Sequence, residues 1–98
     1  MTIKTLLVAN RGEITRRIFR TAKSMGITCI AVYTDTDSNE PFVKEADKSI
    51  YLPTNYLDIE AIIDAAKKTN SDAIHPGYGF LSENASFARA VIEANINC

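Results

Sequence analysis

The sequence is poor in the residues that build metal clusters and disulfide frameworks. Its 98 residues include one histidine, His75, and two cysteines, Cys29 and Cys98. A metal site needs several such ligands at close spacing, and a disulfide scaffold needs a larger, even set of cysteines, so the sequence supports neither. Because unpaired cysteines are typical of reducing compartments, we expect a cytoplasmic protein without a metal site of its own.

Excess charge and long apolar runs are also missing. The net charge is -1 at pH 7, so the sequence lacks the basic footprint of a protein that binds nucleic acid or an anionic membrane. No apolar run approaches the roughly 20 residues needed to span a bilayer. The N-terminus leads directly into a strand-like segment without a cleavage pattern, so we expect no signal peptide. Neither nucleic acid nor a membrane is expected as a partner.

The scarcity of glycine argues against a dinucleotide site. The chain has four glycines, and the first strand-to-helix turn holds one of them, Gly12, where the dinucleotide fingerprint requires three. Glu13 at the start of the following helix would also repel a phosphate. Asp35 follows the second strand, where a Rossmann domain places its ribose-binding carboxylate. Without the glycines, we interpret Asp35 as a solvated loop residue and expect no NAD binding.

Strand-like and helix-like segments alternate along the chain. Apolar runs predict strands, and apolar residues at helical spacing predict helices. The predicted strands are 3–9, 27–33, 49–52 and 72–75, and the predicted helices are 13–25, 41–46, 56–69 and 84–95. A strand, a helix and a strand within about thirty residues form a βαβ unit with parallel strands. The sequence therefore predicts one small α/β domain, a Rossmann-like layered fold with a mostly parallel sheet.

Both long helices carry apolar stripes that we expect to face the core. The first stripe is Ile14, Ile18, Phe19, Ala22 and Met25, and the second is Leu57, Ile59, Ile62, Ile63 and Ala66. From their spacing alone, the basic residues of the first helix form a solvated face near its favourable dipole end. These basic residues are Arg16, Arg17, Arg20 and Lys23.

The segment 96–98 begins what reads as a further strand. A doubly wound domain normally adds a strand after its last helix. We therefore expect the sheet to lack its last strand and the chain to be a fragment or a truncated product.

The segment 75–84, with the sequence HPGYGFLSEN, is the candidate site. Two glycines around Tyr78 predict a loop with positive φ angles or close backbone approach, placed between a strand and a helix where α/β proteins carry their sites. Tyr78 could contact a ligand or tuck into the core. His75 could be a base, a ligand or a structural residue, and its position at a strand end favours the last.

Two further residues of this loop have competing interpretations. Ser82 could be a nucleophile, but no nucleophile elbow surrounds it and no paired base is evident, so Ser82 or Asn84 as a helix N-cap is favoured. Glu83 in the first helical turn is explained by the helix dipole alone. The residues by themselves thus give a loop of interest and no complete catalytic set.

Two motifs carry a family resemblance. The segments 8–14, VANRGEI, and 75–84 closely resemble the N-terminal domain of biotin carboxylase, the module shared by acetyl-CoA, propionyl-CoA, methylcrotonyl-CoA, pyruvate and urea carboxylases. The resemblance covers essentially the whole chain and implies the pre-ATP-grasp version of the Rossmann-like fold. It also implies a chemistry in which ATP phosphorylates bicarbonate to carboxyphosphate, whose CO₂ then carboxylates biotin on a carrier protein.

The same resemblance implies which parts of that enzyme residues 1–98 contain. ATP, Mg²⁺ and biotin serve the full enzyme, and the residues that hold ATP and Mg²⁺ belong to central ATP-grasp and C-terminal domains that these 98 residues do not include. We expect residues 1–98 to bind none of the three tightly and to be inactive alone. The implied partners are those missing domains, the biotin carboxyl carrier protein and a second copy in a homodimer.

The resemblance also implies roles for five residues. It places Tyr78, Gly79 and Glu83 on the biotin side of the active-site cleft, and Arg17 and Arg20 at the dimer interface, against the solvated-face interpretation. Three rivals remain: a free-standing dimerisation or interaction module without catalysis, a dinucleotide-binding domain, and a different ATP-grasp ligase.

Overall fold

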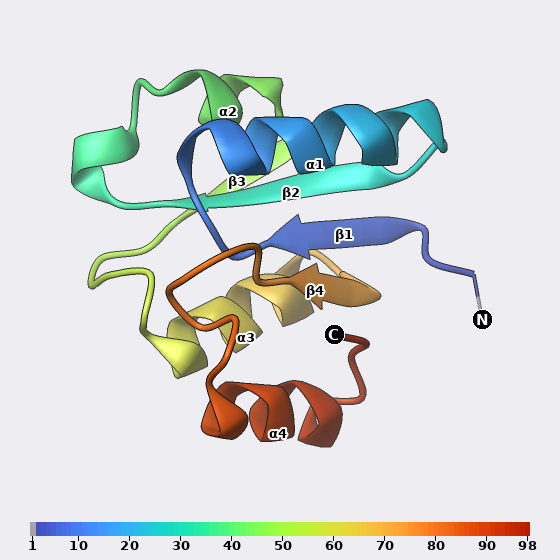
Figure 1. The fold of residues 1–98 in the computed structure, drawn as a ribbon, viewed down its shortest axis with the longest axis vertical. Helices are drawn as coiled ribbons and strands as arrows, with labels where there is room; N and C mark the ends of the chain where they lie inside the picture. Colours follow the sequence, from blue (N-terminus) through green and yellow to red (C-terminus); the bar gives the residue numbers. More distant parts are fainter. Residues whose placement is uncertain (1) are drawn as a thin grey trace.

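The computed structural model describes residues 2–98, which alternate between strands and helices in chain order (Figure 1). The elements are β1 (Thr5–Val8), α1 (Gly12–Ser24), β2 (Thr28–Tyr33), the 3-10 turn η1 (Asp35–Asp37), α2 (Pro41–Glu45), β3 (Lys48–Tyr51), α3 (Ile59–Lys68), β4 (Ala73–His75) and α4 (Ala85–Glu93). The strands form one sheet in the order β3-β2-β1-β4, and every neighbouring pair is parallel. The predicted α/β class and parallel sheet are confirmed.

The predicted further strand begins beside β4. Asn97 forms an isolated parallel bridge with Ala73. The backbone N–H of Ile74 donates to the carbonyl of Asn97 at 2.8 Å, and the N–H of Asn97 donates to the carbonyl of Asp72 at 3.0 Å. Residues 96–98 therefore lie along the outer edge of β4 in the direction that a fifth parallel strand would take.

The sheet separates two hydrophobic cores because successive strand residues point to opposite faces. Leu7 and Ile30 belong to the core on the α3 and α4 side, which also holds Phe87. Val8 belongs to the core on the α1 and α2 side, together with Phe19 and others. Figure 1 shows α1 and α2 on one side of the sheet and α3 and α4 on the other. Burial on both faces explains why the strands read as continuous apolar runs.

The predicted apolar stripe of α1 is only partly correct. Phe19 and Ala22 are buried, but Ile14 and Ile18 are half-buried and Met25 is 69% exposed. The buried row instead runs through Thr15, Phe19 and Ala22. The flank that carries Ile14, Ile18 and Met25 faces Leu6 and the end of β4, where no helix of residues 2–98 packs.

The start of α3 also differs from the prediction. Asp58 caps the helix by accepting a hydrogen bond from the N–H of Ala61 at 3.0 Å, so the helix begins at Ile59. Leu57 precedes this cap and is 57% exposed, so its predicted inward orientation is wrong. Ile62 and Ile63 are buried as expected. In the part of the chain that the structure describes, no helix combines the length and apolarity that crossing a membrane requires.

Thr15 is expected to weaken the fold. Its side chain is fully buried, and its hydroxyl finds no hydrogen-bond partner within residues 2–98. An unpaired buried hydroxyl costs about 1–3 kcal/mol. Thr15→Val keeps the branched shape and removes the polar atom, so it should raise the free energy of unfolding by about 1 kcal/mol in urea unfolding. Thr15→Ser, which keeps the hydroxyl and loses the methyl group, should lower it. A loss of stability in Thr15→Val would contradict this account.

Candidate functional site

The candidate site lies where the strand order reverses. β2 and β3 extend the sheet on one side of β1, and β4 lies on its other side. The loops that leave the carboxyl ends of β1 and β4 therefore diverge at the switch point, the usual ligand position in open α/β sheets. The N–H of Ala9 donates to the carbonyl of His75 at 2.9 Å. This bond brings residue 10 next to residues 75–84, the 75–84 loop.

Positive φ angles shape the 75–84 loop. Gly77 has a φ of 68°, Gly79 has a φ of 66° and Phe80 has a φ of 44°. Only glycine adopts this left-handed region without strain, which confirms the predicted need for two glycines. A Cβ on Gly79 would meet nothing within 4 Å, but one on Gly77 would lie 2.7 Å from Nδ2 of Asn10. Gly77 is thus required for both its backbone angle and its close approach to Asn10.

Asn10 connects the end of β1 to this loop. Its side chain is 2% exposed, and its Nδ2 donates to the carbonyls of Pro76 at 2.7 Å and Tyr78 at 2.6 Å. Its Oδ1 accepts from the N–H of Arg11 at 2.8 Å. The residues before and after Gly77 are therefore held by one amide group from the loop that follows β1.

A buried carboxylate organises the neighbouring loops. Asp37 is 2% exposed, and its carboxylate accepts bonds from Nε and Nη2 of Arg11 and from the hydroxyl of Tyr56 at 2.6, 2.5 and 2.6 Å. The Arg11 guanidinium lowers the pKa of Asp37 below its usual value, and the Tyr56 bond acts in the same direction, although burial opposes both. Burial and the bond to Asp37 raise the pKa of Tyr56 to about 12.

The same network supports the 75–84 loop just after Gly79. The ring of Phe80 packs against Tyr56 with a centroid distance of 5.4 Å and an interplanar angle of 43°. Tyr78 lies between this contact and the Asn10 contact, and its side chain is 77% exposed. Of the two alternatives for Tyr78, the structure therefore rejects burial in the core and presents the side chain on the surface.

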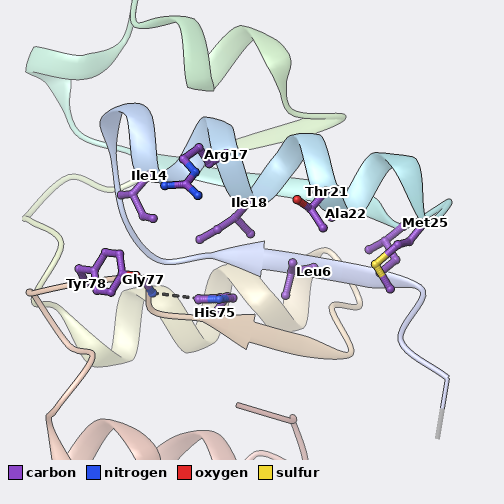
Figure 2. A pocket seen from close by; sticks show the side chains of 11 residues that line it. Leu6, Ile14, Arg17, Ile18, Thr21, Ala22, Met25, His75, Gly77 and Tyr78 are labelled. Atoms are coloured by element: carbon purple, nitrogen blue, oxygen red, sulfur yellow. Dashed lines mark hydrogen bonds between the residues drawn. The ribbon is translucent and has the colours of Figure 1, made fainter.

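An open, mostly apolar groove of about 430 Å³ lies beside Tyr78. Figure 2 shows residues of α1, including Ile14 and Arg17, over Leu6 of β1, with His75 and Tyr78 at the end of β4. Arg17 is exposed and is the one Lys, Arg, Asp or Glu among the lining residues. The structure thus brings together two of the predicted site residues, Arg17 and Tyr78.

The other predicted residues lie outside this groove. Arg20 is exposed and forms an ion pair with Glu13 at 3.3 Å. Gly79 belongs to the loop but does not line the groove, and Glu83 is exposed and also absent from its walls. Glu83 was expected in the first turn of the last helix. This placement is wrong because α4 begins at Ala85, after the N-cap Asn84.

The structure also bears on the competing interpretations of Asn84, His75 and Asp35. Asn84 is the N-cap of α4, since its Oδ1 accepts from the N–H of Phe87 at 2.9 Å. Nδ1 of His75 accepts from the N–H of Gly77 at 3.0 Å, which supports a structural role although the side chain is exposed (Figure 2). Asp35 is exposed, as expected.

Sequence reasoning missed Asn10, Asp37 and Tyr56 as organisers of the site. Asn10 could have been found from its place, because a polar residue directly after a buried strand at the switch point faces the neighbouring loop. Asp37 carries no such signal. It shares a polar loop with Asp35, and only the position of Arg11 shows which of the two is buried.

Comparisons with known proteins agree on one family. Residues 2–98 match the family model described as "Biotin carboxylase, N-terminal domain". The chain is 47% identical to the propionyl-CoA carboxylase alpha chain, mitochondrial, of Homo sapiens, over 97% of this chain and 14% of that protein. It is 46% identical to the biotin carboxylase of Halalkalibacterium halodurans, over 96% of this chain and 22% of that protein.

A solved structure shows the same backbone. The biotin carboxylase domain dimer of the Hydrogenobacter thermophilus 2-oxoglutarate carboxylase, in complex with MgADP, ADP and bicarbonate, has a TM-score of 0.94 and 44% sequence identity. The match covers 98% of this chain and 22% of that chain. The present chain therefore spans less than a quarter of each of these three proteins.

The hydroxyl of Tyr56 gives the fold an alkaline limit. The pKa of an unfolded tyrosine is about 10, and that of folded Tyr56 is about 12. Above pH 10 the unfolded chain releases this proton first, so stability is lost as the pH rises from about 10 to about 12. Tyr56→Phe should cost about 1 kcal/mol at pH 8, and its difference from wild type should shrink over that window.

Urea unfolding at a series of pH values measures this difference. Tyr78→Phe is the matched control, since its hydroxyl sits on an exposed side chain. Its difference from wild type should stay constant. If the difference in unfolding free energy between Tyr56→Phe and wild type does not change with pH, the Tyr56 hydroxyl loses its proton at the same pH in the folded and the unfolded chain. That outcome would contradict the prediction.

Proposed function

Because the chain belongs to the biotin carboxylase N-terminal domain family, we propose that residues 1–98 are the N-terminal part of an ATP-dependent biotin carboxylase. This ligase uses bicarbonate to carboxylate biotin on a carrier protein, and it works as a component of an acyl-CoA, pyruvate or related carboxylase. The observation that carries the proposal is the match over residues 2–98. The fold and the exposed Tyr78 at the switch point support it.

Residues 2–98 by themselves do not fit ATP phosphates or Mg²⁺. No group of three or more His, Cys, Asp or Glu side chains in this range could hold a metal ion. The guanidinium of Arg11 is bonded to Asp37, and Glu13 occupies the first turn of α1, where a phosphate would be repelled. We assign the binding of ATP and Mg²⁺ to ATP-grasp and C-terminal domains beyond these residues. Residues 1–98 alone are inactive in this proposal.

The contribution of this chain is a wall of the biotin side of the cleft. Tyr78 and Gly79 lie on a loop whose backbone is fixed on both sides of Tyr78, by Asn10 and by the Phe80–Tyr56 contact. A tyrosine side chain on a fixed backbone has only two χ angles to order, so it offers contact area at little cost in conformational entropy. Glu83 lies farther along the same loop and is exposed. Tyr78 is the principal substrate contact in this proposal, with Gly79 and Glu83 beside it.

The dimer is a second element of the proposal. The related Hydrogenobacter thermophilus domain was solved as a dimer. In the present chain, Arg17 and Arg20 lie exposed on α1, and half-buried Ile14 and Ile18 lie on the same helix. An apolar patch with arginines is typical of interfaces. We assign Arg17 and Arg20 to the contact between two copies of the complete enzyme.

Tyr78→Ala in the complete protein tests the substrate role. Loss of the ring should raise the KM for biotin by about tenfold, equivalent to about 1.4 kcal/mol, and leave the KM for ATP within about twofold. Steady-state kinetics with each substrate varied in turn provide the measurement. Leu57→Ala, which truncates another exposed side chain outside the loop, is the control and should change neither constant. Equal KM values for biotin in Tyr78→Ala and wild type would remove Tyr78 from the site.

Charge reversal on α1 tests the interface. The double variant Arg17→Glu and Arg20→Glu in the complete protein should raise the dimer Kd by at least about tenfold, because the proposed contact would then hold carboxylates in place of two guanidinium groups. Sedimentation equilibrium measures the Kd. Arg89→Glu, an exposed reversal on α4, should leave it unchanged. A dimer of unaltered affinity would place the contact elsewhere.

A further inference from the structure

We propose that Asn10 is a positioning residue for biotin binding: its side-chain amide holds the backbone on both sides of Gly77 and so fixes where Tyr78 stands. This inference rests on the substrate role proposed for Tyr78. It assigns a function to a residue of β1's carboxyl end that does not line the groove and is 2% exposed.

The first support is the convergence of two carbonyl groups. The oxygens of Pro76 and Tyr78 lie 2.7 and 2.6 Å from the same atom, Nδ2 of Asn10. Two carbonyl oxygens that approach one point repel each other unless a donor stands between them. A primary amide nitrogen has two hydrogens, one for each carbonyl. The conformation of residues 76–78 is therefore favoured only while a two-hydrogen donor occupies this position.

The second support is that the orientation of the Asn10 amide is forced. Its Oδ1 accepts from the N–H of Arg11 at 2.8 Å. A flipped amide would turn its oxygen toward two carbonyls and its nitrogen toward an N–H group, so three hydrogen bonds would become three repulsive contacts. An aspartate at this position would likewise offer no donor to either carbonyl at neutral pH.

The third support is the fit between Asn10 and Gly77. A Cβ on residue 77 would lie 2.7 Å from Nδ2, 3.1 Å from Cγ and 3.2 Å from Cβ of Asn10. The whole amide side chain thus occupies the space that any other residue at position 77 would need. Asn10 packs against the loop as well as binding it, and both contacts fix the peptide that enters Tyr78.

The structure also limits the region that Asn10 controls. Phe80 is held separately by its contact with Tyr56, and α4 is held by the N-cap Asn84. Loss of the Asn10 amide should therefore loosen residues 76–79 and leave residues 80–93 in place. Tyr78 lies within the loosened part, with a side chain that is 77% exposed and that no core contact would hold in place.

The experiment compares Asn10→Ala with Asp72→Ala in the complete protein. Asp72 is a matched control, since its Oδ2 accepts from the N–H groups of Lys4 and Thr5, both at 2.9 Å, at the amino end of the sheet. Each variant removes one side chain that binds two distant backbone groups. Hydrogen–deuterium exchange of the backbone amides of residues 77–79 and the KM values for biotin and ATP are measured for both.

For Asn10→Ala we expect amide exchange within residues 77–79 to accelerate by about tenfold or more, and the KM for biotin to rise by about tenfold with that for ATP within about twofold. Asp72→Ala should show neither change. Combining Asn10→Ala with Tyr78→Ala should raise the KM for biotin no further than Tyr78→Ala alone, because Asn10 acts through Tyr78. Asn10→Ser keeps one donor and should give intermediate values, and it serves as the test variant if Asn10→Ala does not fold.

Three results would overturn the inference. Unchanged exchange in residues 77–79 would show that Asn10 does not hold the loop, whatever the kinetics. Additive KM effects in the double variant would show that Asn10 acts independently of Tyr78. Faster exchange in Asn10→Ala, together with an unaltered KM for biotin in both single variants, would instead refute the substrate role of Tyr78 on which the inference rests.

Discussion

The buried carboxylate of Asp37 is the constraint on which the arrangement of this edge of the sheet depends. A carboxylate that is 2% exposed is tolerated only if charged or hydrogen-bonding partners replace its water. Arg11, from the loop after β1, and Tyr56, from the segment before α3, supply these partners. Three connections of the fold are thereby tied to one group. These bonds favour the charged carboxylate and keep the pKa of Asp37 below its usual value although burial opposes them.

Residues of this network, or next to it, also contact the loop that presents Tyr78. The ring of Tyr56 packs against Phe80. Asn10 directly precedes Arg11, and its amide binds the carbonyls on either side of Gly77. The Tyr78 side chain is therefore exposed, although its backbone has few alternative conformations. Such preorganisation lowers the entropy that a side chain loses when it binds a ligand.

The sequence was sufficient for the order of elements and the class of sheet, because buried parallel strands read as apolar runs and Asn84 and Gly26 mark helix ends. It was insufficient for the orientation of α1, where Met25 was predicted inward and is 69% exposed. Helical spacing identifies a stripe but does not reveal whether a neighbour covers its whole width. Asn10 and Asp37 also escaped prediction because the distant partners that hold them are 19 to 68 residues away in the sequence.

The open groove follows from the topology alone. Crossovers between parallel strands are right-handed, so α1, which leads from β1 to β2, lies on one face of the sheet. The chain then reverses, and α3, which leads from β3 back to β4, must lie on the opposite face. Since α4 packs on that same face (Figure 1), the α1 side of β4 receives no helix from residues 2–98. Leu6, Ile18 and Met25 line the resulting groove beside Tyr78 because the strand order leaves them without a covering helix.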